Sequence, residues 1–270
     1  MNQGEAKKKR NSSIELLRIL CMLGIMGGHY FSHGDISTIT CSRIINFTKS
    51  TYFLQCFSAF SKVTCLIFAL ISGYFSTSVK EVGWKKFFRL LGQKFFYAIT
   101  ITFVLSRLGY NNCGYRNIIK VLQGHWFVNY YLLLILCVPF LNAMCENLTK
   151  TMHKKLVALL LVFWSILPTI ADFVSIFWGL SIRFHSFGNM AIFLVMYIVG
   201  SYLHNHVNLT KTAVWKLVLY CICSVAALLG SIALMDYLAS TTKITNIANH
   251  ASFLKAEYSI VAVAVAVSGL

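Results

Sequence analysis

Two polar side chains in the first apolar stretch of the chain are spaced so that they could do chemistry together. Arg18 and His29 lie eleven residues apart in the segment 11–30, which is otherwise mostly apolar. This offset is about three helical turns, so both side chains fall on one helix face, roughly 16 Å apart along the axis. A guanidinium binds anions, and an imidazole transfers protons near neutral pH or acts as a nucleophile. Because such groups are costly at membrane depth, the pair predicts a functional site if the segment spans a membrane.

The composition places this segment in a membrane protein. The 270 residues are 57% hydrophobic and 12% charged, with a mean hydropathy of +0.69, whereas soluble proteins carry roughly 25% charged residues. The formal net charge of +16 therefore indicates cytoplasmic loops and contact with anionic lipid, and no nucleic-acid partner is expected. The nine cysteines are spread singly, without the spacing of a zinc site. No metal is expected.

Apolar runs of membrane-spanning length recur along the whole chain and predict an all-α, polytopic transmembrane protein. No separate polar domain is evident, so residues 1–270 are expected to form a single transmembrane domain. The last run alternates Val and Ala, but both types are apolar, so in lipid we expect a helix there. This run ends without a polar flank, and we expect further spans to be missing after it. The chain has about eight predicted spans, at residues 14–32, 53–76, 88–108, 125–145, 156–176, 187–204, 214–235 and 256–270.

The distribution of lysine and arginine predicts a multi-pass protein of the cell membrane with a cytoplasmic N-terminus. Residues 1–13 form a basic flank, and with this orientation fifteen basic residues fall in inner segments and eight in outer segments. Positive residues concentrate on the cytoplasmic side of membrane proteins. Glu15 and Arg18 inside the first apolar run argue against a cleaved signal peptide.

Several short stretches between residues 11 and 205 together resemble the acyltransferase-three family of integral-membrane O-acyltransferases. Their order and spacing agree with that family, with two departures. Tyr131 stands where many members have glutamate, and Lys86-Phe-Phe-Arg89 stands for an Arg-x-x-Arg element. The matching stretches are Glu15-Leu-Leu-Arg18 with His29, Leu70-Ile-Ser-Gly-Tyr-Phe75, Trp84-Lys-Lys-Phe-Phe-Arg-Leu90, Trp126-Phe-Val-Asn-Tyr-Tyr131 with Pro139-Phe-Leu-Asn142, and Tyr197-Ile-Val-Gly-Ser-Tyr202.

The resemblance implies transfer of an acyl group, usually acetyl from cytoplasmic acetyl-CoA, to a hydroxyl of a cell-surface carbohydrate or its lipid-linked precursor. Acyl-CoA would be a co-substrate, and no permanently bound cofactor is implied. The resemblance also implies about ten spans, two more than this chain holds. A transporter or flippase, or a polymerase of polysaccharide intermediates, is the alternative. Transport predicts paired broken helices and a polymerase predicts a long arginine-rich outer loop, and the sequence has neither.

On this interpretation His29, Arg18 and Glu15 are the catalytic residues, and His29 acts either as a general base or as an acyl-carrying relay. Arg18 would bind the phosphates of coenzyme A, and Glu15 would orient it. The alternatives are an interfacial anchor for Arg18 and an ordinary helix-surface pair with Glu15. The other expected donor-binding residues are Lys85, Lys86, Arg89, Ser72 and Tyr74, and the expected acceptor-binding residues are His125, Trp126, His33 and Arg183.

Two further patterns have simple interpretations. Gly24 and Gly28 form a small-xxx-small notch, which favours helix packing over passage of the donor's arm. His204-Asn-His206 has the spacing of a metal-binding pair, but it lacks a third ligand nearby.

Overall fold

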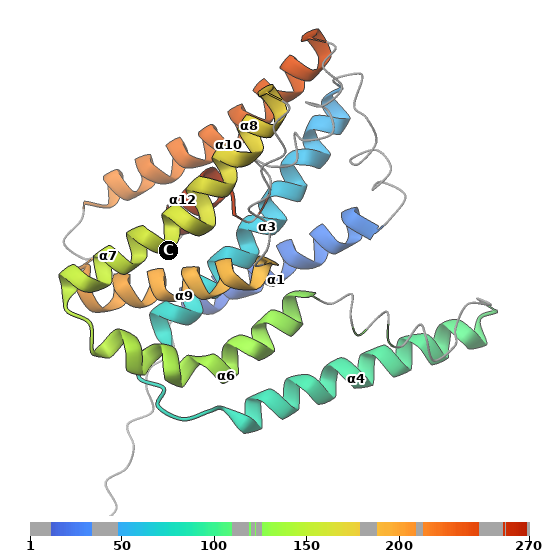
Figure 1. Ribbon diagram of the computed structural model, residues 1–270. Coiled ribbons are helices and arrows are strands. Elements are labelled where there is room, and N and C mark those ends of the chain that lie inside the picture. Colours follow the sequence, from blue (N-terminus) through green and yellow to red (C-terminus); the bar gives the residue numbers. More distant parts are fainter. Residues whose placement is uncertain are drawn as a thin grey trace, which may run out of the picture.

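The computed structural model describes residues 12–33, 48–109, 119, 122, 126–178, 188–208, 213–242, 256 and 258–268. The described part is helical, with no strand, and a helix overlaps each of the eight predicted spans (Figure 1). The all-α prediction is therefore confirmed. The helices are α1 (Ser12–His33), α3 (Lys49–Phe75), α4 (Trp84–Arg107), α6 (Trp126–Glu146), α7 (Lys150–Leu161), the π-helical turn η1 (Val162–Ile166), α8 (Leu167–Trp178), α9 (Gly188–His206), α10 (Val214–Thr242) and α12 (Ile260–Ser268).

Five of the described helical segments are long and apolar enough to cross a membrane. The protein is therefore a multi-pass membrane protein. The alternating Val-Ala run is helical over Ile260–Ser268, as expected for an apolar segment in lipid. The five segments are Tyr52–Phe75, Trp84–Arg107, Trp126–Glu146, Lys150–Ser175 and Val214–Leu238.

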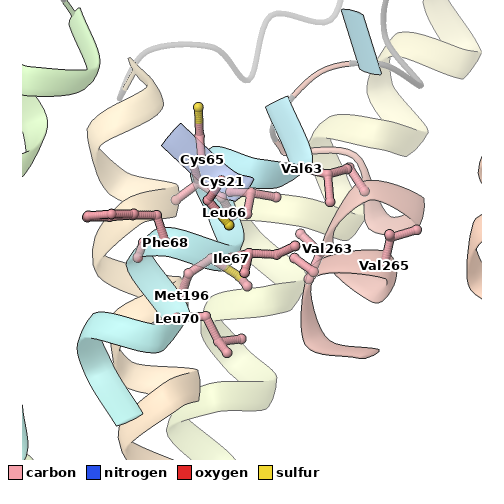
Figure 2. Close-up of a cluster of buried hydrophobic side chains, with 14 of the residues drawn as sticks. Cys21, Val63, Cys65, Leu66, Ile67, Phe68, Leu70, Met196, Val263 and Val265 are labelled. Atoms are coloured by element: carbon pink, nitrogen blue, oxygen red, sulfur yellow. The ribbon is translucent and has the colours of Figure 1, made fainter. Parts of the chain in front are cut away.

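Helix α3 is the centre of the packing, because α1, α9, α10 and α12 all contact it. Figure 2 shows side chains from four of these helices converging in one core, including Cys21, Leu66, Met196 and Val263. These four side chains are almost completely buried. Lipid tails are as apolar as these side chains, so close packing, and not transfer from water, holds such helices together.

The crossing of α3 and α9 requires glycine on both helices. A Cβ atom on Gly73 would overlap the backbone carbonyl of Tyr197, and one on Gly200 would overlap the carbonyl of Leu70. Both glycines belong to stretches that resemble the acyltransferase-three family. Their role is close backbone approach, which fixes α3 against α9.

Helix α1 also packs on α3 through glycine. A Cβ atom on Gly24 would lie 2.8 Å from the side chain of Thr64, and one on Gly28 would overlap Ser61. The Gly24 and Gly28 notch therefore accommodates α3, as the packing interpretation predicts.

A buried polar pair joins α3 to α10. Gln55 Nε2 donates hydrogen bonds to Asp236 Oδ1 at 3.1 Å and to Asp236 Oδ2 at 2.9 Å. Both side chains are almost inaccessible, at 0% and 2% exposure. A buried carboxylate is costly without such hydrogen bonds, so the amide stabilises Asp236 between the helices.

Helices α7, η1 and α8 form one continuous path, and successive helical segments otherwise alternate in direction, so their termini form two ends of the bundle (Figure 1). We call the end that holds the start of α1 and the start of α7 the basic end. The other end holds the C-termini of α1 and α10, and among the described residues it carries Lys49 and Arg107. The described basic residues at or near the basic end are Arg18, Lys80, Lys150, Lys154, Lys155 and Lys216, and the first half of α4 carries Lys85, Lys86, Arg89 and Lys94.

Candidate functional site

The predicted catalytic histidine lies against a predicted acceptor-binding residue. The rings of His29, near the end of α1, and Trp126, at the start of α6, have centroids 6.3 Å apart and planes inclined by 50°. Both side chains are partly buried. The structure thus brings together two sequence-predicted site residues at the end of the bundle opposite the basic end.

Two aromatic residues that the sequence analysis missed complete the surroundings of Trp126. Tyr130 follows it by one helical turn, with ring centroids 5.6 Å apart, and Phe193 of α9 lies 6.3 Å away. The Tyr130 and Phe193 rings also contact each other at 6.0 Å. The spacing of Trp126 and Tyr130 on one helix face was the available signal for Tyr130, whereas Phe193 comes from a distant segment.

Arg18 lies on the same side of α1 as His29. Leu17 and Gly28 lie on the buried side of α1. Arg18 directly follows Leu17, and His29 directly follows Gly28, so both side chains lie next to that buried side. Because α1 is one uninterrupted helix, the predicted separation of roughly 16 Å along its axis holds. Glu15 is exposed, and its role in orienting Arg18 stays a prediction.

The segment between α3 and α4 is fastened to α6. Asn142 of α6 donates hydrogen bonds from Nδ2 to the carbonyls of Ser76 at 2.6 Å and Val79 at 2.8 Å. Its Oδ1 accepts a hydrogen bond from the hydroxyl of Tyr197 at 2.8 Å. Asn142 therefore holds the chain that follows α3 against both α6 and α9.

This segment then runs along α6 before α4 begins. A Cβ atom on Gly83 would lie 3.6 Å from Ile135, and the next contact joins Lys86 Nζ to the hydroxyl of Tyr131 at 2.7 Å. Further along α4, Lys94 donates a hydrogen bond to Asn129. The partner positions on α6 thus move from its basic end towards Trp126, and α4 starts beside the middle of α6.

The path of this segment brings the basic residues at the start of α4 close to His29. The alternation of spans alone would place them at the basic end. Tyr131, the partner of Lys86, lies five residues after Trp126, which is about 7.5 Å along a helix axis. Lys85, Lys86 and Arg89 are all exposed. They are therefore accessible to an anionic ligand beside the Trp126 half of α6.

Ser72 and Tyr74 make contacts within the protein at the end of α3. The Ser72 hydroxyl donates to the carbonyl of Phe68 at 2.8 Å within the same helix. The Tyr74 ring packs edge-on against His204 at 5.0 Å. No described contact joins either side chain to the basic residues of α4.

The paired histidines near the end of α9 have different neighbours. His204 contacts Tyr74, whereas the His206 ring lies 5.2 Å from His153 and 5.4 Å from Tyr202. Within the described residues, no group of three or more His, Cys, Asp or Glu side chains could hold a metal ion.

Three predicted acceptor-binding residues are not placed. His125 and Arg183 lie outside the described residues. His33 ends α1, but its side chain also lies outside the described part of the structure.

Comparison with known proteins identifies the family. No curated protein and no solved structure gives a significant match to the chain. The model of the acyltransferase-three family, described as an acyltransferase domain, matches residues 11–270. That match includes α1 with His29 and all the other helices described above, and it favours an acyltransferase over a transporter or a polymerase. The chain therefore belongs to the acyltransferase-three family and is a multi-pass membrane acyltransferase.

Proposed function

We propose that this protein moves an acyl group, usually acetyl, from cytoplasmic acyl-CoA to a hydroxyl of a cell-surface carbohydrate or its lipid-linked precursor. The contact between His29 and Trp126 is the observation that carries this proposal. An aromatic ring offers a flat apolar surface for a sugar, and an imidazole beside it is within reach of a sugar hydroxyl. The pair has the composition expected of an acceptor site.

His29 has two routes to the product. In the direct route it removes the proton of the acceptor hydroxyl, and the hydroxyl oxygen attacks the thioester carbonyl. The carbon–sulfur bond breaks, and the proton passes from His29 to the sulfur of the departing coenzyme A. In the relay route the imidazole nitrogen attacks the thioester carbonyl, the carbon–sulfur bond breaks, and coenzyme A leaves as its thiolate. The acceptor hydroxyl then attacks the acyl-imidazole and the carbon–nitrogen bond breaks. The hydroxyl proton ends on the thiolate, and the neutral imidazole is restored.

The donor is proposed to bind through the basic residues on α1 and α4. Guanidinium and ammonium groups suit the phosphates of coenzyme A, and Arg18, Lys85, Lys86 and Arg89 supply both. The excess of basic residues at the basic end of the bundle supports a cell-membrane location with that end facing the cytoplasm. Acyl-CoA, the carbohydrate acceptor and membrane lipid are then the expected partners.

The proposed function is tested by replacing His29 in cells that acylate a surface glycan. We expect His29→Ala to abolish the protein-dependent acyl groups on the glycan, measured by mass spectrometry, because the acceptor hydroxyl loses its base or relay. Purified His29→Ala protein in lipid nanodiscs should still bind coenzyme A, since the phosphate-binding residues are intact.

A lipid-facing residue on the same helix provides the control. Met26 is 59% exposed, and Met26→Ala should leave acylation at the wild-type level. The proposal is overturned if His29→Ala cells keep full acylation, or if deleting the protein changes no acyl group on any surface glycan.

A further inference from the structure

Tyr131 holds the side chain of Lys86 in two ways. Its hydroxyl accepts a hydrogen bond from Lys86 Nζ at 2.7 Å, and the same ammonium lies 5.0 Å from the centroid of its ring. Hydrogen bonds from charged donors and cation–π contacts are both favourable. Lys86 is an exposed residue, so these contacts restrict a side chain that would otherwise sample many rotamers.

The ring of Tyr131 is itself fixed by two buried phenylalanines. Phe68 of α3 meets it edge-on at 5.1 Å, and Phe127 lies parallel to it at 6.4 Å. Phe127 in turn contacts Trp126 at 6.2 Å, and Trp126 contacts His29. A continuous series of ring contacts therefore connects the ammonium of Lys86 to the imidazole of His29.

A phenol suits a lysine that must bind an anion. The neutral hydroxyl accepts a hydrogen bond from the ammonium without cancelling its charge, whereas a carboxylate at the same place would form an ion pair. The phenolic proton also stays available for donation to a second acceptor. Arg89 lies one helical turn after Lys86, so its guanidinium projects from nearly the same face of α4.

We propose that Tyr131 is a positioning residue that holds Lys86 beside α6 as an anchor for the phosphates of acyl-CoA. This inference rests on the proposed function and adds the location of the donor. The phosphates bind beside Tyr131 in the Trp126 half of α6, about 7.5 Å along the axis from Trp126. The thioester arm then extends from Lys86 along the outer half of α6 towards His29.

The first test measures donor binding by the full-length protein in lipid nanodiscs. We expect Tyr131→Phe to raise the Kd for coenzyme A about threefold to tenfold, because the ring remains but the hydrogen bond to a charged group is lost. The KM for acyl-CoA should rise similarly while kcat stays near the wild-type value. The double variant with Lys86→Ala should bind no more weakly than Lys86→Ala alone, since Tyr131 acts through Lys86.

Tyr97→Phe provides the matched control. Tyr97 lies on the same helix as Lys86 and is 60% exposed, so the loss of its hydroxyl should not change the Kd. An unchanged Kd in Tyr131→Phe would overturn the donor-anchoring role of Tyr131.

The second test does not depend on coenzyme A. Acetylation of Lys86 by an amine-reactive reagent, followed by mass spectrometry, should be faster in Tyr131→Phe than in the wild type. Equal rates would overturn the positioning role, whatever the protein catalyses. If Lys86 is acetylated faster in Tyr131→Phe but the wild type binds no coenzyme A, the positioning role holds. The proposed function and the phosphate-anchoring role are then overturned.

Discussion

His29 and Trp126 come from different helices, and their contact gives each a more specific role than either has alone. A histidine at the end of a membrane helix is an ordinary interfacial residue, and so is a tryptophan at the start of one. Together, with Tyr130 and Phe193 behind Trp126, they form a polar group set beside an aromatic cluster. Under the proposed function, the aromatic cluster would bind the acceptor and His29 would activate its hydroxyl.

At the residue scale, replacement of Trp126 should affect the acceptor and not the donor. We expect Trp126→Ala to raise the KM for the carbohydrate acceptor about tenfold, equivalent to ~1.4 kcal/mol, because a ring contact is lost. The KM for acyl-CoA should stay within about twofold of the wild-type value, because the proposed donor site is on the α4 cations and not on Trp126. Steady-state kinetics with purified protein measure both constants.

Trp215 offers a matched change, because it is 63% exposed on α10 and lies on a helix without a proposed role. Trp215→Ala should leave both KM values unchanged. A larger effect of Trp126→Ala on the donor than on the acceptor would contradict the assignment of Trp126 to acceptor binding.

At the element scale, α3 and α4 differ sharply in how the protein holds them. Helix α3 is packed on several sides. In the stretch long enough to cross a membrane, 61% of its residues are buried inside the protein, compared with 11% for α4. Of the other helices, α4 makes its main contact with α6. Two lysine contacts, from Lys86 and Lys94, join α4 to α6. The bundle thus combines a fixed central helix with a peripheral helix that carries the proposed donor-binding cations.

Alanine substitutions at glycines test this contrast. We expect Gly73→Ala and Gly200→Ala to destabilise the protein by about 3 kcal/mol or more, because the added methyl meets backbone that cannot move aside. Thermal unfolding in detergent, followed by size-exclusion fluorescence, measures the change as a lower Tm.

Gly92 on α4 gives the opposite expectation. Nothing lies within 4 Å of a Cβ atom at that position, so Gly92→Ala should be neutral or stabilise the helix by up to about 1 kcal/mol. Equal destabilisation by Gly73→Ala and Gly92→Ala would show that the α3–α9 crossing is less constrained than its geometry indicates.

At the scale of the whole molecule, the two ends of the bundle differ in charge and in chemistry. The end with Lys150, Lys154 and Lys155 is basic, and the opposite end carries His29 and Trp126. A single bundle therefore separates the proposed cytoplasmic entry of the donor from the proposed outer site of the acceptor.

Reporter fusions test this orientation in cells. Alkaline phosphatase fused after residue 109 should be active, because the end of α4 is expected outside. The same reporter fused after residue 148 should be inactive, because the connection from α6 to α7 is expected inside, where basic residues are retained.

A protein that fluoresces only in the cytoplasm, fused after the same two residues, is the control. It should be fluorescent after residue 148 and not after residue 109. If alkaline phosphatase is active after residue 148 and inactive after residue 109, His29 faces the cytoplasm. The proposed acceptor on the cell surface is then wrong.

Much of the fold could be predicted from apolar run lengths, because a membrane leaves few choices to the backbone. The first and last residues of individual helices were harder to predict. The span predicted at 156–176 begins six residues earlier as α7, where the Thr149 side chain accepts a hydrogen bond from the Met152 amide and caps the helix. Such a cap lies outside the apolar run, so hydropathy does not detect it.

The site was predictable only in part. The spacing of Arg18 and His29 follows from helix geometry, but their partners depend on which helices meet. The contact of Lys86 with Tyr131 depends on how Asn142 holds the backbone at Ser76 and Val79. Sequence periodicity contains no information about such long-range hydrogen bonds, so the start of α4 beside mid-α6 could not be predicted.

The course of residues 76–83 along α6 has a consequence for what must cross the membrane. This segment brings the start of α4 beside Tyr131. Under the proposed function, that position sets the level inside the bilayer at which the bulky, highly charged coenzyme A is retained. Under the proposed function only the narrow arm and its small cargo pass beyond that level. A wide aqueous pore is then unnecessary, and the cell loses neither its nucleotide carrier nor the ion gradients that such a pore would dissipate. The transport step and the chemical step become one event, in which a chemical group changes sides while the molecule that delivered it stays behind.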